Sequence, residues 1–181
     1  MSLVGKRYAQ ALFDAAVDNK SVDVMSDEFS TVIDLFKSED GLMNLMLTPS
    51  INTSEKKGIL GRVLGESFNQ YLRNFLNILL DKNRFEYVVE IHDAFRQLVL
   101  PYKNMVEATV LTVVPLDEAL RVALEEKLAI RFNKKVILDN QIDETILGGA
   151  VVYVGDQIID GSIRKQLTQM RTQMNNTRLR K

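Results

Sequence analysis

Apolar residues in the first hundred positions recur at intervals of three and four, the spacing of amphipathic helices. This spacing predicts helices over residues 4–19, 22–36, 42–47, 53–64, 67–82 and 85–99. Thr53 or Ser54 is expected to cap the fourth helix, and Pro101 is expected to kink or end the sixth. The strongest apolar stripe lies in the fifth helix, which we expect at the centre of a bundle of about six helices.

The pattern changes after residue 105, where β-branched runs replace the helical spacing. Runs at 108–114, 136–138, 150–154 and 157–159 predict strands, and residues 117–132 predict one more amphipathic helix. We place the boundary near Tyr102 to Met105. The sequence therefore predicts an α+β protein, with an all-helical bundle over residues 1–105 and a small α/β domain over residues 106–181.

The densest group of turn residues lies in residues 141–167, which read QIDETILGGAVVYVGDQIIDGSIRKQL. Two adjacent glycines permit a tight bend before the run AVVYV, and a Gly-Asp pair forms a hairpin turn after it. The next Asp-Gly-Ser ends the second strand, and its serine can cap the helix that follows. The expected turn and cap residues are Gly148, Gly149, Gly155, Asp160, Gly161 and Ser162.

Composition narrows the possible functions. The 181 residues are 46% apolar and 26% charged, as in soluble globular proteins. No apolar run reaches the roughly 18 residues that span a bilayer, and the start lacks a signal-peptide pattern. We therefore expect a soluble chain. The absence of cysteine excludes disulfides, thiolate nucleophiles and cysteine-ligated metals.

The formal net charge of −1 conceals a basic C-terminal segment. Residues 162–181 contain six bases and no acid, whereas residues 106–161 contain five bases and ten acids. The apolar residues of this segment form one narrow helical stripe, Ile163, Leu167, Met170 and Met174. The helix can pack wholly on its own sheet or offer a seam to an acidic or helical partner. Nucleic acid is a weaker alternative, because no aromatic residue is interleaved with the bases.

No group of residues has the pattern of an active site. His92 is the only histidine, and its neighbours in a helix diverge from it, so we interpret it as structural. The acids of residues 139–160 lack calcium-loop spacing and suit turns better. The segment GDQIIDGS has the wrong glycine spacing for a phosphate loop and a serine in place of its lysine. We expect no catalytic residue, cofactor or metal.

Residues 141–167 resemble the C-terminal signature of the delta subunit family of F-type ATP synthase, known in mitochondria as the oligomycin-sensitivity-conferring protein. The sequence RYAQALF at residues 7–13 adds to the resemblance. So does the turn at residues 82–85, although Lys82 and Phe85 depart from the usual E-N-x-R-L of the family. The resemblance extends over essentially the whole chain.

This resemblance implies a non-catalytic stator subunit that couples proton-driven rotation to ATP synthesis. The helical domain would bind the N-termini of alpha subunits on the catalytic head, and the C-terminal domain would hold b-type peripheral-stalk subunits. The chain would then lie on the cytoplasmic face of the cell membrane and contact the membrane only indirectly, through the complex.

Small residues in the first helix, such as Ala11 and Ala15, would let another helix approach closely. That helix is by default the fifth helix of the same bundle, and the alternative is a helix of a partner. The candidate partner-binding residues are Tyr8, Ala11, Leu12, Ala15, Arg84, Arg164, Leu167 and Arg171. The alternative function is a nucleic-acid-binding adaptor that uses the basic C-terminal helix. Its bases are Arg164, Lys165, Arg171, Arg178, Arg180 and Lys181.

Overall fold

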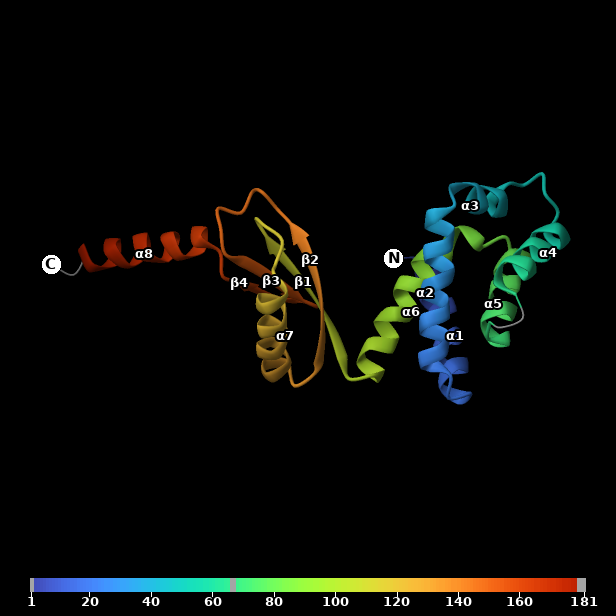
Figure 1. Ribbon diagram of the computed structural model, residues 1–181, viewed down its shortest axis with the longest axis horizontal. Coiled ribbons are helices and arrows are strands. Elements are labelled where there is room, and N and C mark those ends of the chain that lie inside the picture. The colour runs from blue at the N-terminus through green and yellow to red at the C-terminus, as the bar shows by residue number, and fades with distance from the viewer. Residues whose placement is uncertain (1, 66–67, 179–181) are drawn as a thin grey trace. The chain divides into compact units, whose positions relative to one another are not determined.

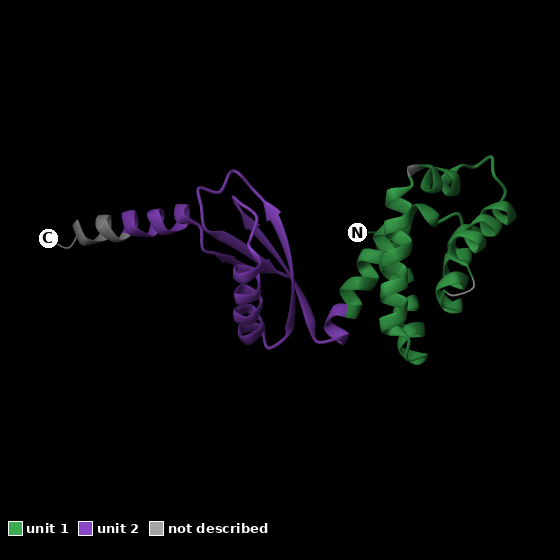
Figure 2. Cartoon of the chain, in the orientation of Figure 1, with its two compact units in different colours: residues 1–99 green, residues 100–181 purple. Residues whose placement is uncertain are grey.

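A computed structural model describes residues 2–65 and 68–178 of the chain. Contacts divide the chain into two compact units, residues 1–99 and residues 100–181 (Figure 2). The first unit is all-helical and the second contains a four-stranded sheet. The predicted α+β class, with its helical N-terminal part, is therefore confirmed. No helix in the described part of the chain is both long and apolar enough to cross a membrane.

The helical unit follows the predicted periodicity closely (Figure 1). Its elements are α1 (Leu3–Asp18), α2 (Val22–Ser38), α3 (Asp40–Leu47), α4 (Thr53–Leu64), α5 (Gln70–Asp81), the 3-10 helix η1 (Phe85–Tyr87) and α6 (Val88–Tyr102). The apolar stripe of α5 is buried in the core of this unit, as predicted. Phe29 of α2 and Phe95 of α6 also lie there, with ring centroids 6.0 Å apart. Burial of these stripes stabilises the bundle.

Helix ends differ from the predictions more than helix positions do. Asn52, and not Thr53 or Ser54, caps α4, because its side chain accepts a hydrogen bond from the Glu55 N–H at 2.8 Å. The predicted start of α5 at residue 67 lies outside the described residues, and the helix begins at Gln70. Helix α6 continues past Pro101 by one residue to its end at 102. A proline in the last turn removes only one backbone donor, so the helix tolerates it.

The second unit forms one sheet with a helix on one face (Figure 1). Its elements are β1 (Met105–Thr112), α7 (Glu118–Phe132), β2 (Lys135–Ile142), β3 (Ala150–Val154), β4 (Gln157–Asp160) and α8 (Ile163–Arg178). The strand order is β2-β1-β3-β4. Strands β1 and β2 are parallel and α7 connects them, whereas β3 pairs antiparallel with both β1 and β4. The β3–β4 hairpin therefore extends the β1 edge and sets the starting point of α8.

Alternating burial along β1 identifies the face that α7 covers. Ala108 and Val110 are fully buried and pack with Leu128 of α7. Asn140 of β2 fixes the loop that leads into α7, because its Nδ2 donates to the Val110 carbonyl at 3.0 Å and its Oδ1 accepts from the Leu116 N–H at 3.0 Å. The core and this polar bridge together hold the strand–helix–strand crossover.

Candidate functional site

A concavity of about 330 Å³ lies on the surface of α1 in the helical unit. Its lining residues are Val4, Arg7, Tyr8, Ala11 and Arg84. Three of them, Tyr8, Ala11 and Arg84, are candidate partner-binding residues from the sequence. Ala11 is exposed and carries no side chain beyond its methyl group, so another helix can approach α1 closely at this point.

The turn after α5 places Arg84 beside α1. Asn83 has a φ of 51°, in the left-handed region, and ends the helix. The Arg84 N–H donates to the Leu79 carbonyl at 2.8 Å, and the Asn83 N–H donates to the Leu80 carbonyl at 3.1 Å. These two bonds form a Schellman motif, for which asparagine is a common residue at the left-handed position. The backbone of Arg84 is thus fixed by the end of α5.

The side chain of Arg84 is held by Tyr8 of α1. Arg84 Nη1 donates a hydrogen bond to Tyr8 Oη at 3.0 Å, and its guanidinium carbon lies 5.6 Å from the Tyr8 ring centroid. The Tyr8 ring packs edge-on against Phe75 of α5, with centroids 6.2 Å apart. A cation over an aromatic face contributes about 0.5–1 kcal/mol at an exposed site. The wall of the concavity is therefore preformed by contacts between α1, α5 and the turn.

The other two candidate residues of α1 lie elsewhere. Leu12 is only 3% exposed and belongs to the core of the helical unit, so it does not form part of the free surface. Ala15 is half-buried and does not line the concavity. Leu12 directly follows Ala11 along the chain, but the helical rotation turns its side chain inward. Periodicity alone did not separate the inward from the outward residues of α1.

An exposed apolar pair on α5 escaped the sequence interpretation. Tyr71 and Ile78 are 48% and 47% exposed, and their spacing places them on one side of the helix, outside its buried stripe. The sequence could have indicated them, because these two large apolar residues do not follow the spacing of the buried stripe. They add apolar surface to the helix that packs against α1 through Phe75.

Glycines of the second unit determine where α8 leaves the sheet. Gly148 and Gly149 have φ values of 143° and 82°, and a Cβ at Gly149 would lie 2.5 Å from the Gly161 carbonyl oxygen. The Gly161 N–H donates to the Ala150 carbonyl at 2.9 Å, and the Ile163 N–H donates to the Gly148 carbonyl at 3.0 Å. The chain before β3 thus lies directly against the chain after β4. Such close backbone contact requires glycine.

The start of α8 is fixed by side-chain hydrogen bonds. Ser162 Oγ accepts from the Lys165 N–H at 3.2 Å, which is the geometry of a helix cap. Asp160 Oδ1 accepts from the Ser162 N–H at 2.9 Å, and this bond holds the pKa of the Asp160 carboxyl below its usual value. Gly155, with a φ of 55°, forms the turn between β3 and β4. Each of these residues has a structural role here.

The described part of the apolar stripe of α8 is exposed, and none of its residues belongs to the hydrophobic core of the sheet. Ile163, Leu167 and Met170 are 43%, 55% and 58% exposed, and the side chain of Met174 lies outside the described residues. Arg164 and Arg171 are exposed beside this stripe, and Arg164 Nη2 donates to the Thr145 carbonyl at 3.2 Å. Of the two arrangements that the sequence allowed, the structure has the seam that is open to a partner.

A family model described as "ATP synthase delta (OSCP) subunit" matches residues 4–174. The chain belongs to this family. The "ATP synthase subunit delta" of Alkaliphilus metalliredigens is 37% identical over 172 residues, with 95% of this chain and 96% of the relative covered. The protein of the same description from Clostridioides difficile is 30% identical over 175 residues, with 96% and 97% covered. The suspected resemblance is confirmed over nearly the full chain.

Solved structures give the same fold. A chain of the Toxoplasma gondii mitochondrial ATP synthase hexamer superposes with a TM-score of 0.77, covering 96% of this chain and 98% of that chain. At 18% identity this likeness concerns the fold alone. These comparisons give no support to the nucleic-acid adaptor that the basic helix also suggested.

The single histidine of this family member is held by three neighbours. His92 Nε2 lies 3.2 Å from Ser30 Oγ, and the ring packs edge-on against Phe29 at 5.1 Å. The expectation that neither sequence neighbour reaches the ring was wrong, because Asp93 Oδ1 lies 3.2 Å from His92 Nδ1. The Asp93 side chain is 59% exposed and still reaches the ring of the preceding residue. Burial lowers the pKa of His92, and both ring nitrogens are engaged, which is the arrangement of a structural histidine.

Acids in and near the sheet accept local hydrogen bonds, Asp143 in a turn and Asp139 within β2. Asp143 Oδ1 accepts from the Thr145 hydroxyl at 2.7 Å and from the Thr145 N–H at 2.9 Å, and these bonds lower the pKa of that carboxyl. Asp139 accepts from the Gln141 side chain at 2.8 Å. Among the described residues, no three acids or histidines are grouped as metal ligands would be.

Proposed function

We propose that the chain is a non-catalytic stator subunit that tethers the catalytic head of ATP synthase to its peripheral stalk. The tether resists the torque of the rotating shaft, so that proton flow is coupled to ATP synthesis. Membership of the delta (OSCP) family supports the assignment. In this proposal the chain contacts the membrane only through the complex, on its cytoplasmic face.

The helical domain, residues 1–105, binds N-terminal segments of alpha subunits in this proposal. The observation that carries it is the concavity on α1, where an exposed alanine lies beside the preformed Arg84–Tyr8 pair. An amphipathic helix can place apolar residues against Tyr8 and Ala11. Its acidic residues or its C-terminal carbonyls can then pair with Arg7 and Arg84 at the rim.

The C-terminal domain, residues 106–181, holds the b-type stalk subunits in this proposal. The exposed stripe of α8 supports this part, since three large apolar residues in a row on one helix face suit a helical partner. Arg164 and Arg171 beside the stripe favour acidic residues on that partner. The two partners therefore contact different units of the chain.

Calorimetry with a peptide from the N-terminus of the alpha subunit tests the first contact. We expect wild-type chain to bind the peptide and Ala11→Glu to lower its affinity at least about tenfold, because a charged side chain fills the closest approach. Ala123→Glu makes the same change at an exposed position of α7 and should alter the affinity less than about twofold. Absence of peptide binding by the wild-type chain would refute the proposal. Equal losses in both variants would refute the role of the concavity.

A further inference from the structure

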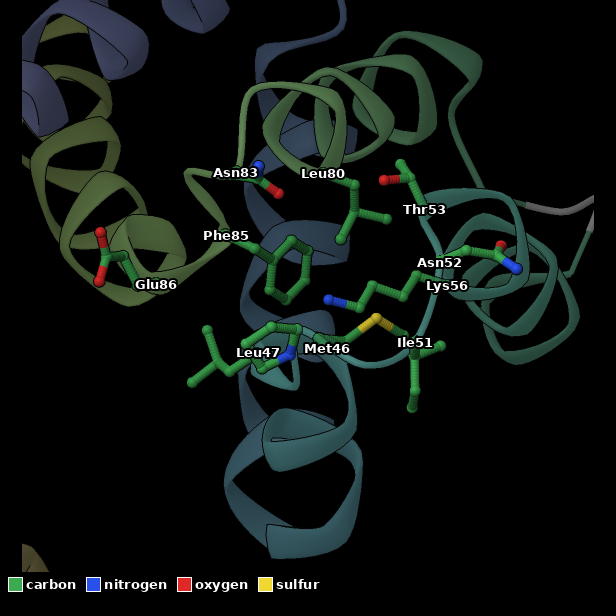
Figure 3. A pocket seen from close by; sticks show the side chains of 11 residues that line it. Met46, Leu47, Ile51, Asn52, Thr53, Lys56, Leu80, Asn83, Phe85 and Glu86 are labelled. Atoms are coloured by element: carbon green, nitrogen blue, oxygen red, sulfur yellow. The ribbon is translucent and has the colours of Figure 1, made fainter.

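A second pocket of the helical unit, of about 580 Å³, lies where α3, α4, α5 and η1 meet (Figure 3). It is lined by Met46, Leu47, Pro49, Ile51, Asn52, Thr53, Lys56, Leu80, Asn83, Phe85 and Glu86. Six of these residues are apolar and one is a lysine. A volume of this size is in the range of small-molecule sites, roughly 300–1,000 Å³. The pocket is separate from the concavity on α1, with which it shares no lining residue.

Lys56 is the unusual residue of this pocket. It is 8% exposed, and its Nζ points inward between Phe85 and Met46 (Figure 3). Within the part of the chain that the structure describes, no hydrogen bond or ion pair holds this ammonium group, which keeps contact with solvent in the pocket. By contrast, the next residue, Lys57, is paired with Asp81 at 2.7 Å. An ammonium group without an ionic partner, beside apolar walls that reduce screening by water, can pair with an anion that enters the pocket.

The N-terminus of α4 adds positive charge to the same pocket. Asn52, the cap residue, and Thr53, the first residue of this 12-residue helix, both line it. The Asn52 side chain accepts from the Glu55 N–H, and the Asn52 carbonyl accepts from the Lys56 N–H at 3.1 Å. The start of a helix favours anions through its dipole. The Lys56 ammonium group and the start of α4 would therefore both attract an anion bound in the pocket.

Among the described residues that line the pocket, the one acid does not neutralise Lys56. Glu86 lies at the pocket's margin and its carboxylate points away from the Lys56 Nζ (Figure 3). That carboxylate accepts a hydrogen bond from Tyr87, whose pKa it raises. The inner part of the pocket therefore keeps a positive charge, with apolar walls formed by Met46, Leu80 and Phe85.

We propose that this pocket binds a small organic anion, a carboxylate carried on an apolar body. The carboxylate lies against Lys56 and the first turn of α4, and the apolar body packs on Phe85, Leu80 and Met46. The inference is independent of the stator function, because it uses none of the residues of the α1 concavity or of α8.

Titration of the full chain with hexanoate, followed by calorimetry and by amide chemical shifts, tests the site. We expect a dissociation constant of about 1 mM or below, with shifts concentrated around α4 and η1. Lys56→Met keeps a chain of similar length and should weaken binding at least about tenfold. It should not lower the melting temperature, because the Lys56 ammonium makes no hydrogen bond or ion pair and the methionine keeps the apolar part of the side chain. Lys57→Met, on the same helix but outside the pocket, should change the affinity less than about twofold.

Three outcomes would overturn the proposal. The first is no saturable binding of hexanoate, and the second is unchanged affinity in Lys56→Met. The third comes from inorganic phosphate, which carries the charge without an apolar body and should bind at least about tenfold more weakly than hexanoate. Phosphate that binds as tightly would show that the apolar walls take no part. Since these titrations need no ATP synthase partner, their failure would leave the stator function untouched.

Discussion

Gly149 occupies a position where only glycine fits the backbone. Its φ is 82°, and a Cβ placed on it would lie 2.5 Å from the Gly161 carbonyl oxygen, so both observations exclude a side chain. Gly149→Ala should lower the free energy of unfolding by at least about 2 kcal/mol, from backbone strain and from displacement of the segment after β4. Urea denaturation with the circular dichroism of the sheet-containing unit measures this loss.

Gly155 provides the matched control for that substitution. It also has a positive φ, 55°, but no atom beyond its two chain neighbours lies within 4 Å of a Cβ placed on it. Gly155→Ala should therefore lower the stability by only about 1 kcal/mol, the cost of the left-handed conformation alone. Equal losses at the two glycines would mean that the contact between Gly149 and Gly161 is unimportant.

His92 makes stability depend on pH. Burial lowers the pKa of His92 below its unfolded value of about 6.5, so the folded state favours the neutral ring. The stability that the neutral ring contributes is complete above the unfolded pKa and is lost as the pH falls through the folded pKa. The Asp93 carboxylate opposes this shift, whereas Arg96 and Lys37 add to it. We expect the melting temperature to fall from about pH 7 to about pH 5.5, and His92→Gln to flatten this fall. An identical slope in the variant would contradict the assignment.

At the scale of the element, substitutions at the start of α4 test which residue caps this helix. The Asn52 side chain satisfies the Glu55 N–H, so Asn52→Ala should lower the free energy of unfolding by about 1 kcal/mol. Thr53→Ala and Ser54→Ala, at the positions that the sequence favoured as caps, should each change it by less than about 0.5 kcal/mol. Urea denaturation measures these losses. A larger loss for Thr53→Ala or Ser54→Ala than for Asn52→Ala would favour the cap that the sequence predicted.

The helices and strands were predictable because the apolar residues along each of them repeat with the period of that structure. The buried stripe of α5 and the run at 150–154 need no tertiary information to read, and both match the structure. The caps were less predictable, because asparagine, threonine and serine at 52–54 are all good caps and only backbone geometry selects one. The candidate sites were least predictable. The Arg84–Tyr8 bond joins residues 76 positions apart, and the inward turn of Lys56 depends on how α3, α4 and α5 pack.

At the scale of the whole molecule, the described residues form two hydrophobic cores, one in each unit. A fragment of residues 1–104 keeps all of α6 and should fold alone, with a cooperative melting transition and the helical circular dichroism of its unit. A fragment of residues 1–87 lacks Ile91 and Phe95, which are 0% and 1% exposed, and should fail to fold. An unfolded 1–104 fragment would show that the helical core depends on the sheet unit.

A tether works only if each end binds its own partner, which makes the two proposed surfaces separable. Leu167 is 55% exposed on α8, so Leu167→Glu should leave the melting temperature unchanged while it lowers affinity for the b-type stalk at least about tenfold. Binding of the alpha-subunit peptide by the same variant should be unaltered, because the concavity lies in the other unit. Thr168→Glu puts the same charge on the adjacent exposed position and should weaken stalk binding far less. A variant that loses both partners and melts earlier would place Leu167 in a core contact and would remove α8 from the proposed stalk surface.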